Sequence, residues 1–325
     1  MTMSYPGTLH NYAPRLVAFE FSYSGTPKPH SLLFIGGLTD GLCTVPYVQE
    51  LAKALEPTEW SLFHLHLSSS HVGWGIGSLD RDVEEIGQCV KYVRNLKRTT
   101  KGDSKVVIMG HSTGSQDVLH YLYSANPPPH NADIDGVSGL TRPGVDGAIM
   151  QAPVSDREAL LQCTRESSEA HEAYEKLVKY AREQHARAIC PIELSGLVGL
   201  DPVTPVSARR FWSLASPESP GKPSEDDLFS SDLTDERLGE TFGRIAARGL
   251  LRTTLVALYS ENDEYAPSWV DKKALLERWK HATDAEGEKK WDDEASGIIP
   301  GASHNVRDEG QRWMIERVLK YLNRV

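Results

Sequence analysis

Short apolar runs rich in β-branched residues alternate along this 325-residue chain with stretches of helical periodicity. Apolar residues at steps of three and four predict helices over Leu79 to Val93 and over Met314 to Leu322. Strands that alternate with helices imply an α/β fold, in which a mostly parallel, doubly covered sheet has helices on both faces. The runs that predict strands are Leu16–Phe21, Ser31–Ile35, Trp60–Leu65, Lys105–Met109, Gly147–Gln151, Thr253–Tyr259 and Gly297–Ile299.

One long segment, residues 154–250, interrupts the alternation because no run within it predicts a strand. It contains an expected exposed helix over Glu169 to His185, followed by several prolines that favour turns and loops. We therefore expect a core of residues 1–153 and 251–325. Residues 154–250 are expected to form an inserted helical lid subdomain over the carboxyl edge of the sheet.

The charge and cysteine content exclude several classes of protein. A net charge of −10 and a pI near 5.7 argue against a nucleic-acid partner, which requires clustered Lys and Arg, and against an anionic membrane. No apolar stretch is long enough for a signal peptide or a bilayer span, so a cytoplasmic location is expected. The four cysteines are widely spaced, which indicates reduced thiols and no disulfide framework.

The strongest local signal is a strand–turn–helix pattern around Ser112, with the sequence KVVIMGHSTGSQDVLHYLY. An apolar strand runs into Gly110-His111-Ser112-Thr113-Gly114 and then into an apolar helix face. This context is typical of a nucleophile elbow, in which a sharp turn exposes the serine hydroxyl above the sheet. Ser112 is therefore the candidate nucleophile.

A serine hydroxyl needs a base within hydrogen-bond reach to act as a nucleophile at neutral pH. His304 follows the last predicted strand and precedes the last helix, in the sequence IIPGASHNV. That position places it at the same edge of the sheet as Ser112. His304 is therefore the candidate base.

The acid that orients the base is expected after a strand that lies between the serine and the histidine in the chain. Asp263 fits this position in the sequence LVALYSENDEYAP, but Glu261 and Glu264 flank it. We favour Asp263 as the acid and expect both glutamates to face solvent. Asp156, which follows the preceding strand, is a minor competitor.

Attack on a carbonyl carbon creates an oxyanion that preorganised donors must stabilise. The backbone N–H of Thr113, next to the nucleophile, is one candidate donor. The loop FIGGL supplies the second, with the amide of Gly37 favoured and that of Leu38 next, because glycine permits a close backbone approach. Trp74, in a glycine-rich segment, is the candidate substrate-binding side chain at the rim of the site.

No metal site or cofactor is predicted. His64 and His66 lie two apart on a predicted strand and His71 follows, but no acidic or cysteine ligand stands at a matching spacing. Histidines in this arrangement more often pack or form hydrogen bonds. Arg209 and Arg210 are expected to lie on the surface of the lid, with their aliphatic stems packed and their charges in water.

A resemblance to a known family is carried by FIGGLTDGL, SSSHVGWGIGSLDRDVEEI, GHSTGSQDVLHYL and PGASHNV. Together these stretches resemble the fungal siderophore esterases of the SidJ type, in a fungal and plant branch of the α/β-hydrolases. The resemblance covers residues 31–151 and 253–325. It implies that Ser112 is the nucleophile, His304 the base and Asp263 the acid. It also implies an intracellular hydrolase that opens the ester bonds of fusarinine-type ferric siderophores and so releases iron.

The leading hypothesis from the sequence is a cofactor-independent serine esterase acting on a small-molecule ester. Ferric fusarinine-type siderophores carry free amines, and residues 154–250 contain 17 Asp and Glu against 12 Lys and Arg, which would attract a cationic ligand. Two alternatives remain open. One is an esterase or thioesterase for an unrelated acyl substrate, and the other is a catalytically silent protein that uses the hydrolase fold for binding.

Overall fold

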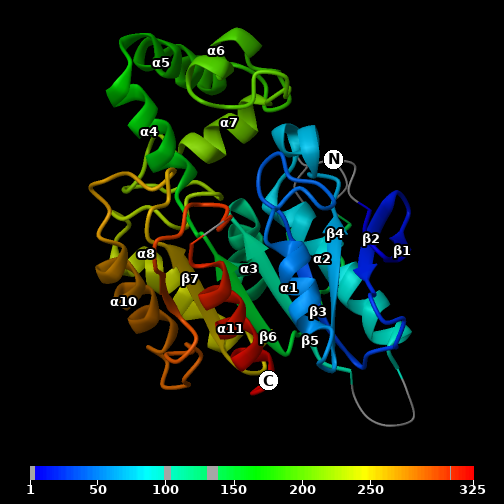
Figure 1. Ribbon diagram of the computed structural model, residues 1–325. Helices are drawn as coiled ribbons and strands as arrows, with labels where there is room; N and C mark the ends of the chain where they lie inside the picture. The colour runs from blue at the N-terminus through cyan, green and yellow to red at the C-terminus, as the bar shows by residue number, and fades with distance from the viewer. Residues whose placement is uncertain (1–3, 99–103, 130–137, 308) are drawn as a thin grey trace.

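A central eight-stranded sheet organises the computed structural model, which describes residues 4–98, 104–129, 138–307 and 309–325 (Figure 1). The strand order is β1-β2-β4-β3-β5-β6-β7-β8. The pairs from β4 through β8 are parallel, whereas β2 runs antiparallel to both β1 and β4. The strands are β1 (Gly7–Ala13), β2 (Leu16–Phe21), β3 (His30–Ile35), β4 (Trp60–His66), β5 (Val106–His111), β6 (Gly147–Gln151), β7 (Leu255–Ser260) and β8 (Gly297–Ile299).

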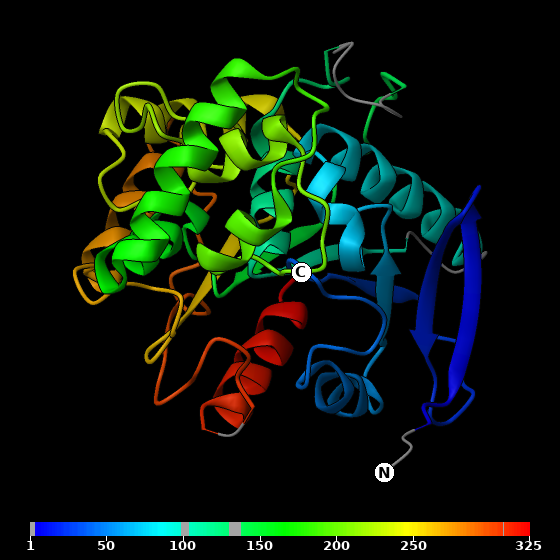
Figure 2. The same ribbon diagram turned by 90° about the horizontal axis from the view of Figure 1, so that it is seen from above.

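The mostly parallel sheet confirms the predicted fold class, and each of the seven predicted strands is present. Strand β1 was not predicted. It forms the edge of the sheet, and most of its residues are exposed, so its sequence GTLHNYA contains no apolar run. The strand is stabilised by its antiparallel pairing with β2 in a hairpin. Figure 2 shows the β1–β2 hairpin at one side of the molecule, away from the green helices of residues 154–215.

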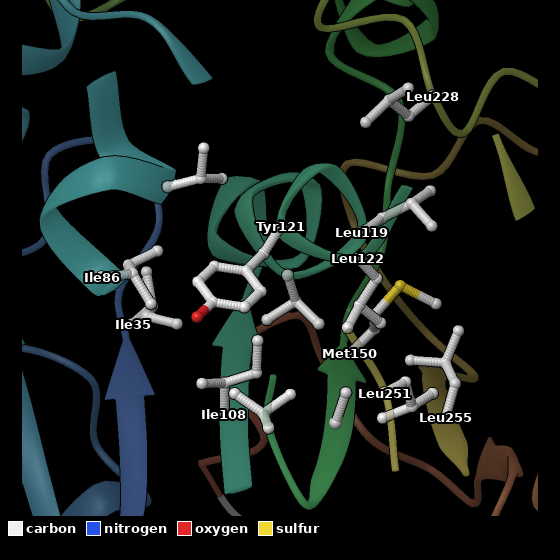
Figure 3. Close-up of a cluster of buried hydrophobic side chains, with 14 of the residues drawn as sticks. Ile35, Ile86, Ile108, Leu119, Tyr121, Leu122, Met150, Leu228, Leu251 and Leu255 are labelled. Carbon is white, nitrogen blue, oxygen red and sulfur yellow. The ribbon is translucent and has the colours of Figure 1, made fainter. Parts of the chain in front are cut away.

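Helices cover both faces of the sheet, and alternate residues of β3 show the two sides. Leu33 and Ile35 belong to a cluster with α2 (Leu79–Leu96), α3 (Thr113–Tyr123) and α10 (Lys272–Thr283), part of which is drawn in Figure 3. Leu32 and Phe34 belong to a second cluster with α1 (Val48–Leu55) and α11 (Gln311–Leu322). The period of two along a strand thus feeds two separate cores.

Residues 154–250 form helices, with no β-strand assigned in this fully described segment. The first four helices stand beyond the carboxyl ends of the strands in Figure 1 and pack around a third apolar cluster, which includes Trp74 of the short 3₁₀ helix η1 (His71–Ile76). The later elements pack against α3 and α10 and contribute Phe242 and Ile245 to the core of the sheet. The division into core and lid stays a prediction. The helices are α4 (Asp156–Glu166), α5 (Ser168–Glu183), α6 (Ile192–Leu197), α7 (Ala208–Ala215), α8 (Asp235–Glu240), η2 (Phe242–Arg244) and α9 (Ile245–Arg248).

Among the described helices, none combines the length and the apolar content that crossing a membrane requires. The predicted catalytic residues lie at the edge of the sheet where the parallel strands end, because β5, β7 and β8 run in the same direction. The loops after these three strands carry Ser112, Asp263 and His304.

Candidate active site

Ser112 lies in the sharp turn between β5 and α3, with φ 55° and ψ −124°. A positive φ is unfavourable for a residue with a Cβ, so the surrounding structure must hold this conformation in place. The Ser112 N–H donates to the carbonyl of Gln151 at 2.9 Å, and the Ser112 carbonyl accepts from the N–H of Ser115 at 2.8 Å. These backbone bonds to β6 and α3 fix the serine at the edge of the sheet.

Two glycines allow the chain to turn this tightly. A Cβ at Gly110 would lie 2.0 Å from the carbonyl oxygen of Gly114, and a Cβ at Gly114 would lie 2.5 Å from the carbonyl oxygen of Ile35. Both contacts are with backbone, which cannot move aside as a flexible side chain can. The spacing Gly-x-Ser-x-Gly is therefore required by the packing of β5, α3 and β3.

His304 and Asp263 are brought together as the sequence predicts. The Nδ1 of His304 lies 2.9 Å from each carboxylate oxygen of Asp263, and the Asp263 side chain is fully buried. A carboxylate can only accept, so His304 carries a proton on Nδ1 and leaves Nε2 as its basic nitrogen. The ring of Tyr265 packs edge-on to His304, with centroids 4.7 Å apart.

The two glutamates beside Asp263 are exposed, as expected, and they also bind the loop that carries His304. Glu264 accepts a hydrogen bond from the backbone N–H of His304 at 2.8 Å. Glu261 accepts one from the N–H of Gly301 at 2.6 Å. The SENDE sequence thus places one carboxylate on the ring of His304 and two on its backbone loop, a role that residue types alone do not reveal.

The side chain of Gln151 contacts both His111 and His304. Its Nε2 lies 3.4 Å from the carbonyl oxygen of His304, so its Oε1 faces the Nδ1 of His111 at 2.6 Å and the hydroxyl of Tyr47 at 2.8 Å. Because Oε1 only accepts, His111 must carry its proton on Nδ1. Burial, together with the adjacent His304, lowers the pKa of His111 to about 4, so His111 is neutral near pH 7.

A cavity of about 330 Å³ opens above these residues. Ser112, His304 and His111 share it with the predicted residues Leu38 and Trp74, whereas Asp263 lies behind His304. The full lining is Leu38, Thr39, Asp40, Trp74, His111, Ser112, Val154, Asp156, Ala159, Gly199, Leu200, Asp201, Tyr265, His304 and Asn305. Residues of the core and of residues 154–250 therefore enclose one site.

The three predicted oxyanion donors lie around Ser112. Thr113 is the first residue of α3, where backbone N–H groups lack partners within the helix. A Cβ at Gly37 would lie 3.2 Å from the Ser112 hydroxyl oxygen, so the Gly37 backbone approaches the nucleophile closely. Its N–H, however, donates to the carboxylate of Asp40 at 2.8 Å. Leu38, the next residue, lines the cavity.

Trp74 is almost completely buried between η1 and the helices of residues 154–215, and it lines the cavity. Its backbone carbonyl accepts from the Nε of Arg210 at 3.1 Å. The indole N–H has no hydrogen-bond partner among the described residues. A buried donor without a partner, in the wall of a cavity, is suited to meet an acceptor on a ligand.

The expected surface position of Arg210 is wrong. Arg210 is 3% exposed, and its guanidinium donates to the carboxylate of Asp226 at 2.5 Å. Nothing in the sequence pairs the two residues, because the loop that brings Asp226 back to α7 has no regular pattern. Arg209, by contrast, is half-buried and donates to Glu225 at 3.1 Å.

Of the histidines considered for metal binding, His64 has another partner. His64 is buried, its Nδ1 accepts from the backbone N–H of Cys43 at 3.3 Å, and burial lowers its pKa to about 4. The rings of His66 and His71 pack 5.6 Å apart. Within the described residues, the group with three possible ligand atoms close together is elsewhere and comprises Asp80, His120 and Glu225.

Asp156 lies in the cavity wall at the first turn of α4, whereas the Nδ1 of His304 is contacted by Asp263. Its Oδ2 accepts from the amide of Gln116 at 2.6 Å. Burial raises the pKa of the Asp156 carboxyl to about 6, and the nearby Asp226 contributes in the same direction. Tyr265 and His111 are site residues that the sequence patterns did not indicate, whereas Asp156 was considered only as a competitor for the acid.

Comparisons with known proteins support one family. The model of the family described as "Protein of unknown function (DUF1749)" matches residues 1–323. The chain is 51% identical to "Fusarinine C esterase sidJ" of Aspergillus fumigatus, with 98% of this chain and 96% of that protein covered. It is 46% identical to "Esterase AN6793" of Emericella nidulans, with 98% and 92% covered.

A solved structure, "Siderophore hydrolase EstB from Aspergillus fumigatus", matches with a TM-score of 0.86 and 49% identity over 98% of this chain and 97% of that one. These matches extend over nearly the complete chain. The chain belongs to the DUF1749 family and, within it, to the SidJ-type fungal siderophore esterases of the α/β-hydrolase fold.

Proposed function

We propose that this chain is a serine esterase that hydrolyses the ester bonds of a fusarinine-type ferric siderophore. The observation that carries the proposal is the meeting of Ser112 and His304 in one cavity, with Asp263 bound to His304, in a chain half identical to a fusarinine C esterase. The fold alone would not support it, because the same fold also serves proteins without enzymatic activity.

The chemistry follows from the positions of the three side chains. The Ser112 Oγ attacks the ester carbonyl carbon as His304 Nε2 takes its proton, and the carbonyl electron pair becomes the oxyanion. When the tetrahedral intermediate collapses, the C–O bond breaks and His304 returns the proton to the leaving alcohol. Water then repeats the sequence on the acyl-enzyme and restores Ser112. Asp263 keeps the proton of His304 on Nδ1 throughout and stabilises the imidazolium.

The oxyanion is proposed to bind between the N–H groups of Leu38 and Thr113. The Gly37 N–H is engaged by Asp40, which leaves Leu38 as the better donor from that loop. The bond between Gly37 and Asp40 instead holds the loop in a compact turn. Each donor of this kind contributes about 3 kcal/mol to transition-state stabilisation.

The helices α4 to α7 are proposed to act as a lid over the cavity, because Ala159, Leu200 and Asp201 from this part of the chain line it. Trp74 is proposed to contact the substrate from the opposite element, η1. A cytoplasmic site of action is proposed as well, and the four free cysteines fit a reducing compartment.

The test compares the native enzyme with a Ser112→Ala variant on a ferric fusarinine-type siderophore, followed by mass spectrometry. The native enzyme should release linear products that gain one water for each ester opened. Ser112→Ala should lose turnover by a factor of about 10⁶ while it still binds the substrate. Turnover retained by Ser112→Ala would refute the assignment of the nucleophile.

Labelling with a fluorophosphonate distinguishes the alternatives. A label on Ser112 would favour an esterase for an unrelated acyl substrate if the enzyme hydrolyses esters of different acyl chain length but no siderophore. A native chain that is folded, unlabelled and inactive on all esters would favour a silent binding protein. Both outcomes would contradict the proposed function.

A further inference from the structure

The charged side chains that line the active-site cavity are all acidic at neutral pH. Asp40, Asp156 and Asp201 line it, and none of its lining residues, all in the described part of the chain, is a lysine or arginine. A cleft bordered by one sign of charge concentrates its field within the cavity. The cavity is therefore suited to a substrate that carries a positive charge.

In two of these acids, both carboxylate oxygens already accept hydrogen bonds from the protein. Asp40 accepts from the N–H of Gly37 and from the hydroxyl of Thr44, each at 2.8 Å. Asp201 accepts from the N–H of Val203 at 3.3 Å and from a threonine hydroxyl at 2.5 Å. These bonds shape the loops of the cavity wall, so neither carboxylate has an unused oxygen.

Asp156 differs because only its Oδ2 is bonded, to the amide of Gln116. Its Oδ1 has no hydrogen-bond partner among the described residues, and Asp156 forms no ion pair with them. A neighbouring buried cation, Arg210, is held by Asp226 and by the carbonyl of Trp74. A partly buried carboxylate without a counter-ion gains most from a cationic ligand.

His111 adds a second acceptor to the same cavity. Gln151 fixes its proton on Nδ1, so Nε2 is unprotonated and can only accept a hydrogen bond. A pKa near 4 keeps the ring neutral, so it does not oppose a positive charge. An ammonium group has three N–H donors and no acceptor, so its chemistry complements acceptors such as these.

We propose that Asp156 binds an ammonium group of the ester substrate and thereby selects amine-bearing esters over their N-acylated counterparts. The inference rests on the proposed esterase function and extends it to a specificity-determining residue. The amine would lie near the first turn of α4, while the scissile ester lies at Ser112. Acylation of the amine removes the charge and so removes the reason for selection.

The test uses two substrates that differ only in charge, ferric fusarinine C and the same compound after acetylation of its amines. The Asp156→Asn variant retains an acceptor for Gln116 but carries no charge. We expect its ratio of kcat/KM for the amine over the acetylated substrate to fall about 10- to 100-fold below that of the native enzyme, mostly through KM. Activity on the acetylated substrate should change less than about threefold.

Glu169→Gln is the matched control, because it removes one exposed negative charge from α5 in the same segment and should leave the ratio unchanged. An unchanged ratio in Asp156→Asn would overturn the inference, and so would an equal loss on both substrates. A native enzyme without preference for the amine would overturn it too. The esterase proposal fails separately, if the native enzyme opens neither substrate nor 4-nitrophenyl acetate.

Discussion

Replacing Asp263 by Asn tests which of three neighbouring acids orients the catalytic base. The substitution keeps the size of the side chain and removes a negative charge whose two oxygens both lie 2.9 Å from His304 Nδ1. With charge centres roughly 4 Å apart and an effective dielectric constant of about 20, the lost attraction for the imidazolium is about 4 kcal/mol. That energy corresponds to a roughly 10³-fold loss in kcat.

The tautomer of His304 adds to this loss. An asparagine amide can donate to Nδ1 and so favour the form of His304 that carries its proton on Nε2, which cannot accept the proton of Ser112. A total loss of about 10⁴ in kcat is therefore expected. KM should change little, because Asp263 does not line the cavity.

The assay is steady-state hydrolysis of 4-nitrophenyl acetate at pH 8, with thermal unfolding as a check on the fold. Glu261→Gln and Glu264→Gln are matched controls, because among the described residues each carboxylate bonds only a backbone N–H, and the amide oxygen of Gln preserves that bond. Each should lose less than about tenfold. A loss below about 30-fold in Asp263→Asn, or a 10³-fold loss in either control, would refute the reasoning.

Three further outcomes are expected. Gly114→Ala should lower the free energy of unfolding by about 1–3 kcal/mol in urea titrations, because the new methyl would lie 2.5 Å from a carbonyl oxygen of β3. Arg210→Met should lower the free energy of unfolding by about 3–5 kcal/mol, because it leaves the buried Asp226 unpaired. The double variant Arg210→Met/Asp226→Leu should recover part of that loss. The preference for an amine-bearing over an acetylated ester should rise from pH 5 to pH 7, because Asp156 has a pKa of about 6 and is charged only above it. Asp226, Arg210 and His304 surround that carboxyl, and the ratio is used because the same Ser112 and His304 hydrolyse both esters.

The sequence predicted those parts of the fold and site that repeat a local pattern. Buried parallel strands read as apolar runs, and the turn around Ser112 needs glycine at fixed positions because backbone atoms approach within 2.0–2.5 Å of the missing Cβ atoms. Strand β1 could not be found this way, because an exposed edge strand has little apolar sequence. Its backbone pairing with β2 is what makes β1 a strand.

The parts of the site that depend on distant contacts were beyond the sequence. Arg210 was expected in water, but a carboxylate 16 residues further along the chain draws it into the interior. The tautomer of His111 is decided by Gln151, which lies 40 residues away. Neither pairing follows a helical or strand period, so only the folded arrangement reveals it.

Helix α3 connects the chemistry of the site with its selectivity. Ser112 precedes the helix, and Gln116, one turn later, donates to Asp156 at 2.6 Å and to the carbonyl of Asp226 at 3.0 Å. The nucleophile and the proposed ammonium acceptor are therefore held by one rigid element. It follows that the site should discriminate by the distance between amine and ester, as well as by charge. An amine moved along the same substrate by two methylene groups should lose most of the advantage that Asp156 confers, whereas selection by the overall negative charge of the cavity alone would be indifferent to that distance.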